Sequence, residues 1–434
     1  MNFSRFFAVM VCAILTCLLT NCSSGSGHGS PPHITPLDAQ TGRFLDSAVT
    51  GVEYSTPHWS HITGFDGILM SDVPGSFIYQ PGEEVTFSIG GVVLGSAQAQ
   101  RTVTPIDLVP GAVDTNNNAV INICQFLQSL DNDAQPENGI LITEEVRNVL
   151  ANFESIDFDA PSLESIPEVQ VMFEALNAEG VFPENKKPIP EERSIVSAGS
   201  ALIHFEETLI RIEQEEAAAQ NIPFSAEIRK PVADVVLFQG QSFPIVGLAY
   251  GGTEPYFMEW ILENDQGIEL YRGPDPSGII TGLAPGNYVL QFNASDSIRK
   301  EYNDQRLITV FDSSLNTYSP YDEPVAVNIF GPGNTVLMPR DSISAPLWDM
   351  VTLGAEITYG NPPFFYSWAY PPSAESATSI RLRSSGSKQY IHFDNTFSFS
   401  SPGIYQVRIT VKDSPVYPKF DYDVYNPSVD VIVR

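Results

Sequence analysis

Cysteine is scarce in this chain, and its distribution is uneven. Cys12, Cys17 and Cys22 all lie in the first 22 residues, so Cys124 is the remaining thiol of the 434 residues. One cysteine cannot form a disulfide within residues 23–434, and we expect packed apolar cores to stabilise the fold. Cys124 lies in the stretch AVINICQFLQSL, among apolar residues at helical spacing. We therefore predict a buried, unreactive thiol.

Basic residues are also few. The 22 Lys and Arg residues stand against 52 Asp and Glu residues, which gives a net charge of −30. Such a charge repels phosphate backbones and anionic lipid headgroups. Nucleic acid is therefore not an expected partner.

Several motifs that signal catalysis are missing. The sequence has no Gly-x-Ser-x-Gly, no His-Glu-x-x-His, no phosphate loop and no Cys-x-x-Cys. His58 and His61, in TPHWSHITGFDG, are close enough to share a metal, with Asp66 as a third ligand. We favour a surface loop in which Trp59 packs, and we predict that the chain is not an enzyme. Paired carboxylates for glycoside hydrolysis stay open, because their separation is not visible in a sequence.

The N-terminal residues have the pattern of an export signal. Arg5 is the one charge before an apolar run from Phe6 to Leu19, which ends in LLTNC and is followed by SSGSGHGS. This pattern resembles the bacterial lipoprotein signal, although Asn21 departs from its usual small residue. The resemblance implies acylation at Cys22 and, because Ser23 follows, an outer-membrane location. A secreted or periplasmic protein cleaved nearby is the alternative. Residues 23–42 are polar and rich in Pro, Gly and Ser, which indicates a flexible linker.

Short alternating segments fill residues 43–115 and predict a small β-sandwich. In GSFIYQPGEEVTFSIG, Phe77 and Tyr79 precede a Pro-Gly turn, and Val85, Phe87 and Ile89 share one face of the next strand. This segment resembles the carboxypeptidase-regulatory or transthyretin-like sandwich. The longer run from FLDSAVTGVEYST through NICQFLQSLD is similar to bacterial lipoproteins without an assigned activity.

Residues 116–222 change to a helical period and form an acidic helical segment. Thr143 is placed to cap a helix that has Glu144 and Glu145 in its first turn. Apolar stripes predict two further helices, one around Val169–Leu176 and a longer one over residues 197–220.

The stretch SLDNDAQPENGILI, residues 129–142, has the acids of a calcium loop. It fails as an EF-hand because Pro136 stands at the glycine position and Ile142 at the bidentate glutamate position. Calcium bound by Asp131, Asp133 and Glu137 stays open on ligand chemistry alone. A turn set by the proline and the following Asn-Gly pair explains the stretch without an ion.

Two copies of one module follow. Residues 250–260 read YGGTEPYFMEW and residues 359–368 read YGNPPFFYSW; LAPGNYVLQFNASDS and SSPGIYQVRITVKDS follow downstream. Each copy has a Trp on a strand, Trp260 or Trp368, and later a Tyr after Pro-Gly, Tyr288 or Tyr405. A Trp packed between two sheets and alternating strands are features of an immunoglobulin-like sandwich. We predict such domains at residues 228–312 and 322–434.

The repeated pattern resembles polycystic-kidney-disease (PKD) type domains. One departure is the run after each Trp, ILENDQG or AYPPSAE, where the family has Asp-Phe-Gly-Asp-Gly. The resemblance implies spacer or contact modules on an extracellular protein. Aromatic residues are candidates for contact with a sugar or a partner protein, although core packing is the favoured interpretation. These candidates are Trp59, Tyr256, Phe257, Phe364 and Phe365.

The sequence thus predicts a mainly β, multidomain fold with one α-helical segment. The expected function is that of a non-catalytic envelope lipoprotein, attached by its lipid anchor, that presents sandwich modules to a protein or ligand. The alternatives are a polysaccharide-binding accessory protein and a metal-dependent hydrolase that uses His58 and His61. No cofactor is expected, and calcium alone stays open.

Overall fold

A computed structural model describes residues 39–65, 73–313, 326–332, 335–338, 341–359, 364–371, 374–385, 388–412, 424–425 and 427–434. The predicted signal, Cys22, Asp66 and most of the predicted linker lie outside these residues. Within them the fold is mainly β and multidomain, which confirms the predicted fold class. Of the helices described, none is both long and apolar enough to cross a membrane.

The N-terminal domain begins with two small sheets. Their orders are β5-β1-β8 and β4-β3-β6-β7. In β6, Val85, Phe87 and Ile89 are buried and alternate with less buried residues, as predicted. The elements are β1 (Gln40–Phe44), β2 (Val49–Thr50), β3 (Glu53–Ser55), β4 (Ser60–Ile62), β5 (Ser76–Tyr79), β6 (Glu84–Ile89), β7 (Val92–Gln98), β8 (Thr102–Val103) and α1 (Pro105–Leu108).

Helices follow where the sequence predicts them. Thr143 Oγ1 accepts a hydrogen bond from the amide of Val146, and Ser197 Oγ accepts one from the amide of Ser200, so both helix caps form. The short strand β9 pairs in parallel with β2. The elements are α2 (Asn118–Ser129), η1 (Pro136–Asn138), β9 (Ile140–Leu141), α3 (Glu144–Leu150), η2 (Leu163–Ser165), α4 (Pro167–Ala178), η3 (Pro183–Lys186) and α5 (Ala198–Ala219).

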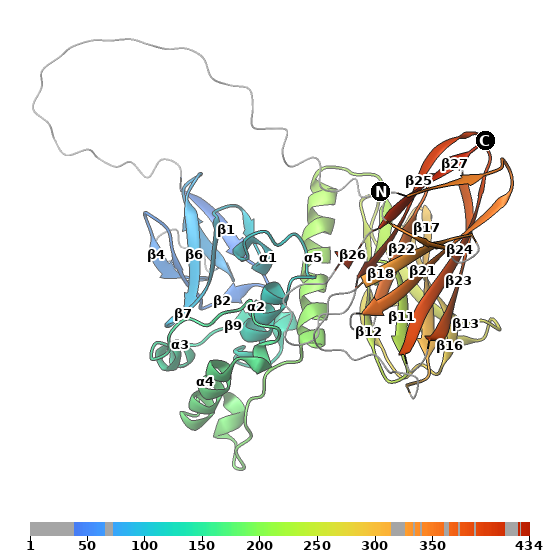
Figure 1. The fold of residues 1–434 in the computed structure, drawn as a ribbon. Helices are drawn as coiled ribbons and strands as arrows, with labels where there is room; N and C mark the ends of the chain where they lie inside the picture. Colours follow the sequence, from blue (N-terminus) through green and yellow to red (C-terminus); the bar gives the residue numbers. More distant parts are fainter. Residues whose placement is uncertain are drawn as a thin grey trace, which may run out of the picture. The chain divides into compact units, whose positions relative to one another are not determined.

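One continuous hydrophobic core joins these strands and helices, from Phe44 to Phe205. The strands of residues 43–115 and the helices of residues 116–222 therefore share a core, and their division into separate domains stays a prediction. The core is shared because the small sheets have apolar faces that the helices cover. Helix α5 packs against α2 and also against β12 of the following domain (Figure 1).

The next domain is a sandwich of two sheets, β10-β12-β15 and β14-β13-β16-β17-β11. Trp260 on β13 is fully buried, and its ring lies 4.6 Å from that of Phe292. The predicted internal position of Trp260 is confirmed. The strands are β10 (Ser225–Lys230), β11 (Asp234–Phe238), β12 (Phe243–Tyr250), β13 (Phe257–Asn264), β14 (Glu269–Gly273), β15 (Ser277–Ile280), β16 (Gly286–Ser295) and β17 (Glu301–Phe311).

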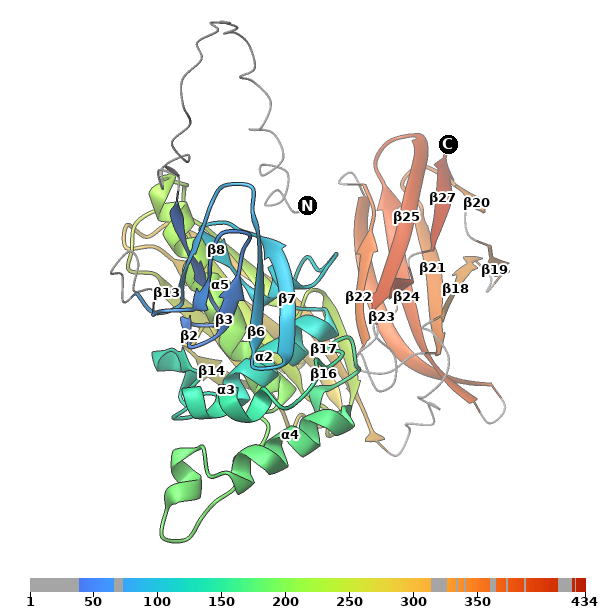
Figure 2. The same ribbon diagram turned by 90° about the vertical axis from the view of Figure 1, so that its left-hand side faces the viewer.

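The last domain is also a sandwich, with β19-β18-β21-β24-β23 facing β22-β25-β27-β20 (Figure 2). Trp368 is only partly buried, and Tyr366 on the same strand is the fully buried residue, 4.6 Å from the ring of Phe393. The strands are β18 (Ala326–Gly331), β19 (Thr335–Leu337), β20 (Ser342–Ala345), β21 (Met350–Tyr359), β22 (Phe364–Ala369), β23 (Ala374–Ser385), β24 (Lys388–Phe399), β25 (Gly403–Lys412), β26 (Val424–Tyr425) and β27 (Ser428–Val433).

A tyrosine hydrogen bond recurs in both sandwiches. Tyr288 Oη donates to the carbonyl of Ala284 at 2.6 Å, and Tyr405 Oη donates to the carbonyl of Ser401 at 2.9 Å. Each bond reaches back four residues, as in the tyrosine corner of immunoglobulin-like domains. The chain therefore contains tandem immunoglobulin-like sandwiches.

Strand β11 belongs to both sandwiches. It pairs in parallel with β17 and antiparallel with β22, which gives a ten-stranded sheet that spans both domains. Val235 and Leu237 lie in the core of the first sandwich, whereas Val236 lies in the core of the last. Because side chains alternate across a strand, one strand supplies both cores.

Candidate functional site

Two neighbouring loops at one end of the first sandwich form an ordered surface. We call residues 251–257 and 295–301 the loop pair; they are the connections β12–β13 and β16–β17 together with the strand-end residues Phe257, Ser295 and Glu301. Asp296 is buried at its centre. Its Oδ1 accepts hydrogen bonds from the amides of Ile298, at 3.1 Å, and Lys300, at 2.9 Å. The carboxylate therefore fixes the second loop from inside.

The two loops are also bonded to each other. The amide of Ser297 donates to the carbonyl of Thr253 at 2.9 Å. Gly252 has a φ of 66°, and a Cβ there would lie 2.7 Å from Asp296 Oδ2. Only glycine fits this close approach without strain. The loop pair is thus held by backbone and side-chain contacts.

The loop pair presents apolar side chains to solvent. Phe257 is 62% exposed and Ile298 is 66% exposed. Tyr256 is half-buried, with its ring 6.0 Å from that of Phe224. Burial, and then the charges of Glu254 and Asp296, raise the pKa of Tyr256, so its hydroxyl remains a hydrogen-bond donor. Ordered loops that expose an aromatic ring are a typical arrangement for contact with a partner.

The other predicted aromatic residues are less available. Phe364 lies in the core of the last sandwich and is fully buried. Phe365 points to the opposite face of β22 and is partly buried against the core of the first sandwich. Trp59 is partly buried against the N-terminal core. Of the five predicted residues, Phe257 is the one that the structure exposes.

The two histidines of the predicted metal site have separate contacts. His58 Nδ1 forms a short contact with Glu83 Oε1, and the ring of His61 lies 6.3 Å from that of Tyr54. Asp66, the proposed third ligand, lies outside the described residues. Among those residues, no group of three or more His, Cys, Asp or Glu side chains is placed to hold a metal. The hypothesis of a metal site at His58 and His61 stays a prediction.

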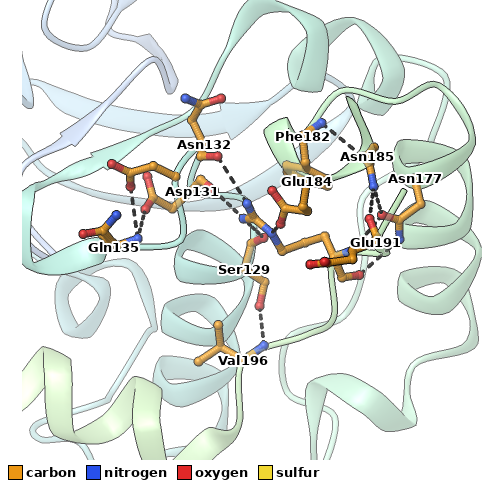
Figure 3. A network of polar contacts seen from close by, with 12 residues as sticks. Ser129, Asp131, Asn132, Gln135, Asn177, Phe182, Glu184, Asn185, Glu191 and Val196 are labelled. Atoms are coloured by element: carbon orange, nitrogen blue, oxygen red, sulfur yellow. Dashed lines mark hydrogen bonds and ion pairs between the residues drawn. The ribbon is translucent and has the colours of Figure 1, made fainter. Parts of the chain in front are cut away.

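The predicted calcium residues divide into two places. Asp131 Oδ2 and Asp133 Oδ1 both accept a hydrogen bond from the amide of Gln135, at 2.9 and 3.0 Å (Figure 3). Burial raises the pKa of Asp131 to about 6. Glu137 points elsewhere and lines a cavity beside Arg211 on α5. Binding of calcium stays a prediction.

A buried arginine explains the order of this region. Arg193 donates through Nη1 to the carbonyl of Ser129 at 3.3 Å and through Nη2 to that of Asn132 at 3.2 Å. Its guanidinium lies 4.3 Å from the ring centre of Phe182 and forms an ion pair with Glu184 (Figure 3). A cation at the C-terminal end of α2 also matches the helix dipole. This network is structural.

Sequence reasoning missed a buried polar cluster in the N-terminal domain. Ser47 Oγ lies 3.0 Å from His204 Nε2, and Asp46 Oδ1 lies 3.9 Å from the same nitrogen. Burial raises the pKa of Asp46 to about 7. Cys124 is buried beside Asp46, and burial raises its thiol pKa well above the ordinary value, as expected for an unreactive cysteine.

Comparisons with known proteins give a limited result. No protein-family model matches the chain, and no curated protein matches it. Among solved structures, the fibronectin(III)-like modules of Clostridium thermocellum CbhA match with 14% identity over 48% of this chain and 94% of that one, at a TM-score of 0.18. A Bacteroides ovatus glucan-utilization protein, SGBP-B, solved with a mixed-linkage heptasaccharide, matches with 14% identity over 48% of this chain and 47% of that one, at a TM-score of 0.17. The D00-D0 domain of intimin matches with 12% identity over 49% of this chain and 99% of that one, at a TM-score of 0.17. Such low scores support no statement about what this chain binds.

Proposed function

We propose that this chain is a non-catalytic binding protein that contacts a partner protein through the loop pair. The observation that supports this function most directly is the exposure of Phe257 and Ile298 on loops that Asp296 holds in place. A side chain presented by an ordered loop loses little conformational entropy on binding. We also propose that the protein is exported and that an acyl group on Cys22 attaches it to the membrane.

The chemistry of the surface favours a protein partner over a sugar. Ile298 has no flat ring to stack on a sugar, but aliphatic and aromatic side chains together are typical of protein interfaces. The net charge of −30 favours a partner with a basic surface. We therefore expect an apolar contact surrounded by complementary charge.

A site-specific photocrosslinking experiment tests this proposal. A photoreactive residue at position 257 or 298, in the full chain in intact envelopes, is expected to give one discrete adduct of defined mass. The matched control is position 404, because Ile404 is 71% exposed on the last sandwich. Equal crosslinking at all three positions, or none at the loop pair, would contradict the proposal.

A polysaccharide ligand is the second candidate, since an exposed Phe257 ring is able to stack on a sugar. Phe257→Leu separates the two functions. It removes the ring but keeps apolar area, so it should abolish binding on a glycan array and only weaken a protein contact. A protein adduct that survives Phe257→Leu supports the first function, and a glycan signal lost in the same variant supports the second.

The proposed anchor has its own test. The intact mass of the protein from a membrane fraction should correspond to a chain that begins at an acylated Cys22. A mass that fits an unmodified chain starting elsewhere would exclude the anchor, and it would leave the binding surface unaffected.

A further inference from the structure

A cavity in the N-terminal domain is lined by both signs of charge. Its volume is about 220 Å³, and it lies between the turn after β1, the helix η1 and one face of α5. Arg43 and Arg211 supply two guanidinium groups, and Glu137 and Glu215 supply two carboxylates. The domain thus has a small concave site with polar and apolar lining, and most of its charged side chains reach solvent.

These four charges are not neutralised by one another. No ion pair within 4.0 Å joins Arg43, Arg211, Glu137 or Glu215 to another side chain in the described part of the chain. Glu137, Arg211 and Glu215 are exposed and Arg43 is partly buried, so water solvates these charges in the free protein, and a molecule that contacts both signs would replace that water.

Arg43 also has an unused donor. Its Nε is buried and has no hydrogen-bond partner among the described residues. A buried donor without a partner costs free energy, and nearly all such groups in folded proteins find one. A carboxylate is the strongest common acceptor for a guanidinium group.

Ser47 holds the second guanidinium in position. The amide of Ser47 donates to Thr208 Oγ1 at 3.0 Å, and Arg211 Nη2 donates to Ser47 Oγ at 3.3 Å. Ser47 has a φ of 57°, a conformation that glycine adopts with less strain. Burial lowers the pKa of His204, so Nε2 of its neutral ring is able to accept a hydrogen bond from the Ser47 hydroxyl. The Ser47 hydroxyl, together with Thr208 Oγ1 at 3.0 Å from the same nitrogen, thus orients Arg211.

We infer that this cavity binds a small zwitterion, a molecule with one carboxylate and one ammonium group, such as an α-amino acid. The carboxylate would contact Arg43 and Arg211, and the ammonium group would contact Glu137 and Glu215. A zwitterion carries no net charge, so the net charge of −30 does not repel it as it repels an anion. This inference is independent of the loop pair and of the proposed partner.

Titration calorimetry on the purified full chain tests this inference. The probes are the standard L-α-amino acids, followed by two relatives of the strongest binder: its decarboxylated amine and its N-acetylated acid. We expect at least one amino acid to bind with a Kd below about 1 mM, and each relative to bind at least roughly tenfold more weakly.

Variants then assign the site. Arg211→Gln and Glu215→Gln should each weaken binding by about tenfold or more. Glu216→Gln is the matched control, because Glu216 is an exposed neighbour on α5 that does not line the cavity. Circular dichroism checks that each variant is folded. The inference is wrong if no amino acid binds, if either relative binds as well as its parent, or if Glu215→Gln leaves the affinity unchanged.

Discussion

The N-terminal domain and the two sandwiches are built on different kinds of core. The N-terminal domain buries charged and amide side chains, among them Asp46, Gln128 and Glu206. The sandwiches are filled mainly by aromatic and branched aliphatic residues around Trp260 and Tyr366. Apolar cores need only the right pattern and volume, whereas a buried polar group needs a specific partner. The two regions should therefore respond to different perturbations.

The largest effect is expected from the apolar core. Trp260→Ala removes a fully buried ring and should lower the free energy of unfolding of the first sandwich by about 3–5 kcal/mol. Trp368→Ala is the matched variant and should cost clearly less, because Trp368 is partly exposed. Chemical denaturation, with hydrogen exchange to resolve the domains, measures both. Equal losses would mean that the two tryptophans have the same role.

The polar core predicts a pH effect instead. The pKa of Asp46 is about 7 in the fold against an ordinary value of 3.8, because burial disfavours the carboxylate. The folded state therefore binds the proton more tightly, and this group lowers stability as pH rises from about 4 to about 7. Relative to the wild type, Asp46→Asn should gain up to roughly 4 kcal/mol across that window.

Denaturation at a series of pH values checks this expectation, and a difference that does not change with pH would contradict it. Since His204 Nε2 lies 3.9 Å from Asp46 Oδ1 and also titrates, the series is repeated with His204→Gln. Loss of the effect only in that background would show that the two groups titrate together.

A smaller effect distinguishes the two faces of β11. Val235→Ala and Val236→Ala each remove similar buried volume and should cost about 2 kcal/mol. The first should raise hydrogen exchange in β13 and β16, and the second in β24 and β25, because the two side chains lie in different cores. The same exchange pattern in both variants would show that β11 serves only one core.

The smallest expected effect comes from the repeated tyrosine. Tyr288→Phe removes one hydrogen bond to the Ala284 carbonyl and should cost about 1 kcal/mol. Tyr405→Phe should cost less, because the Tyr405 hydroxyl bond is solvent-exposed. Thermal denaturation of both variants measures the difference, and a neutral Tyr288→Phe would argue against a structural role for this bond.

Much of the fold could be predicted because its pattern is local. Alternation in β6 and the stripe of α4 are visible within about ten residues, and the repeat identifies both sandwiches by comparison of the chain with itself. Three consecutive aromatic residues, Phe364, Phe365 and Tyr366, form the sequence pattern of a strand that is buried on both faces. A strand covered on both faces has no alternation, and β22 is covered by both sandwich cores.

The cavity could not be predicted in this way. Ser47 and His204 are separated by 157 residues, and polar contacts at that distance leave no periodic pattern. Glu137 was identified from the acids of residues 129–142, yet its place in a cavity that α5 also lines comes from the tertiary fold. Phe257 was identified as an aromatic candidate, but its exposure depends on which way the β12–β13 loop turns.

The double membership of β11 has a practical consequence for dissecting this protein. A fragment that ends before β22 would leave β11 as an unprotected edge, with its backbone groups open and Val236 exposed to water. Such edges recruit strands from other molecules. Cutting between the two sandwiches should therefore yield self-associating material, whereas cutting upstream of β10 keeps the shared strand covered on both sides.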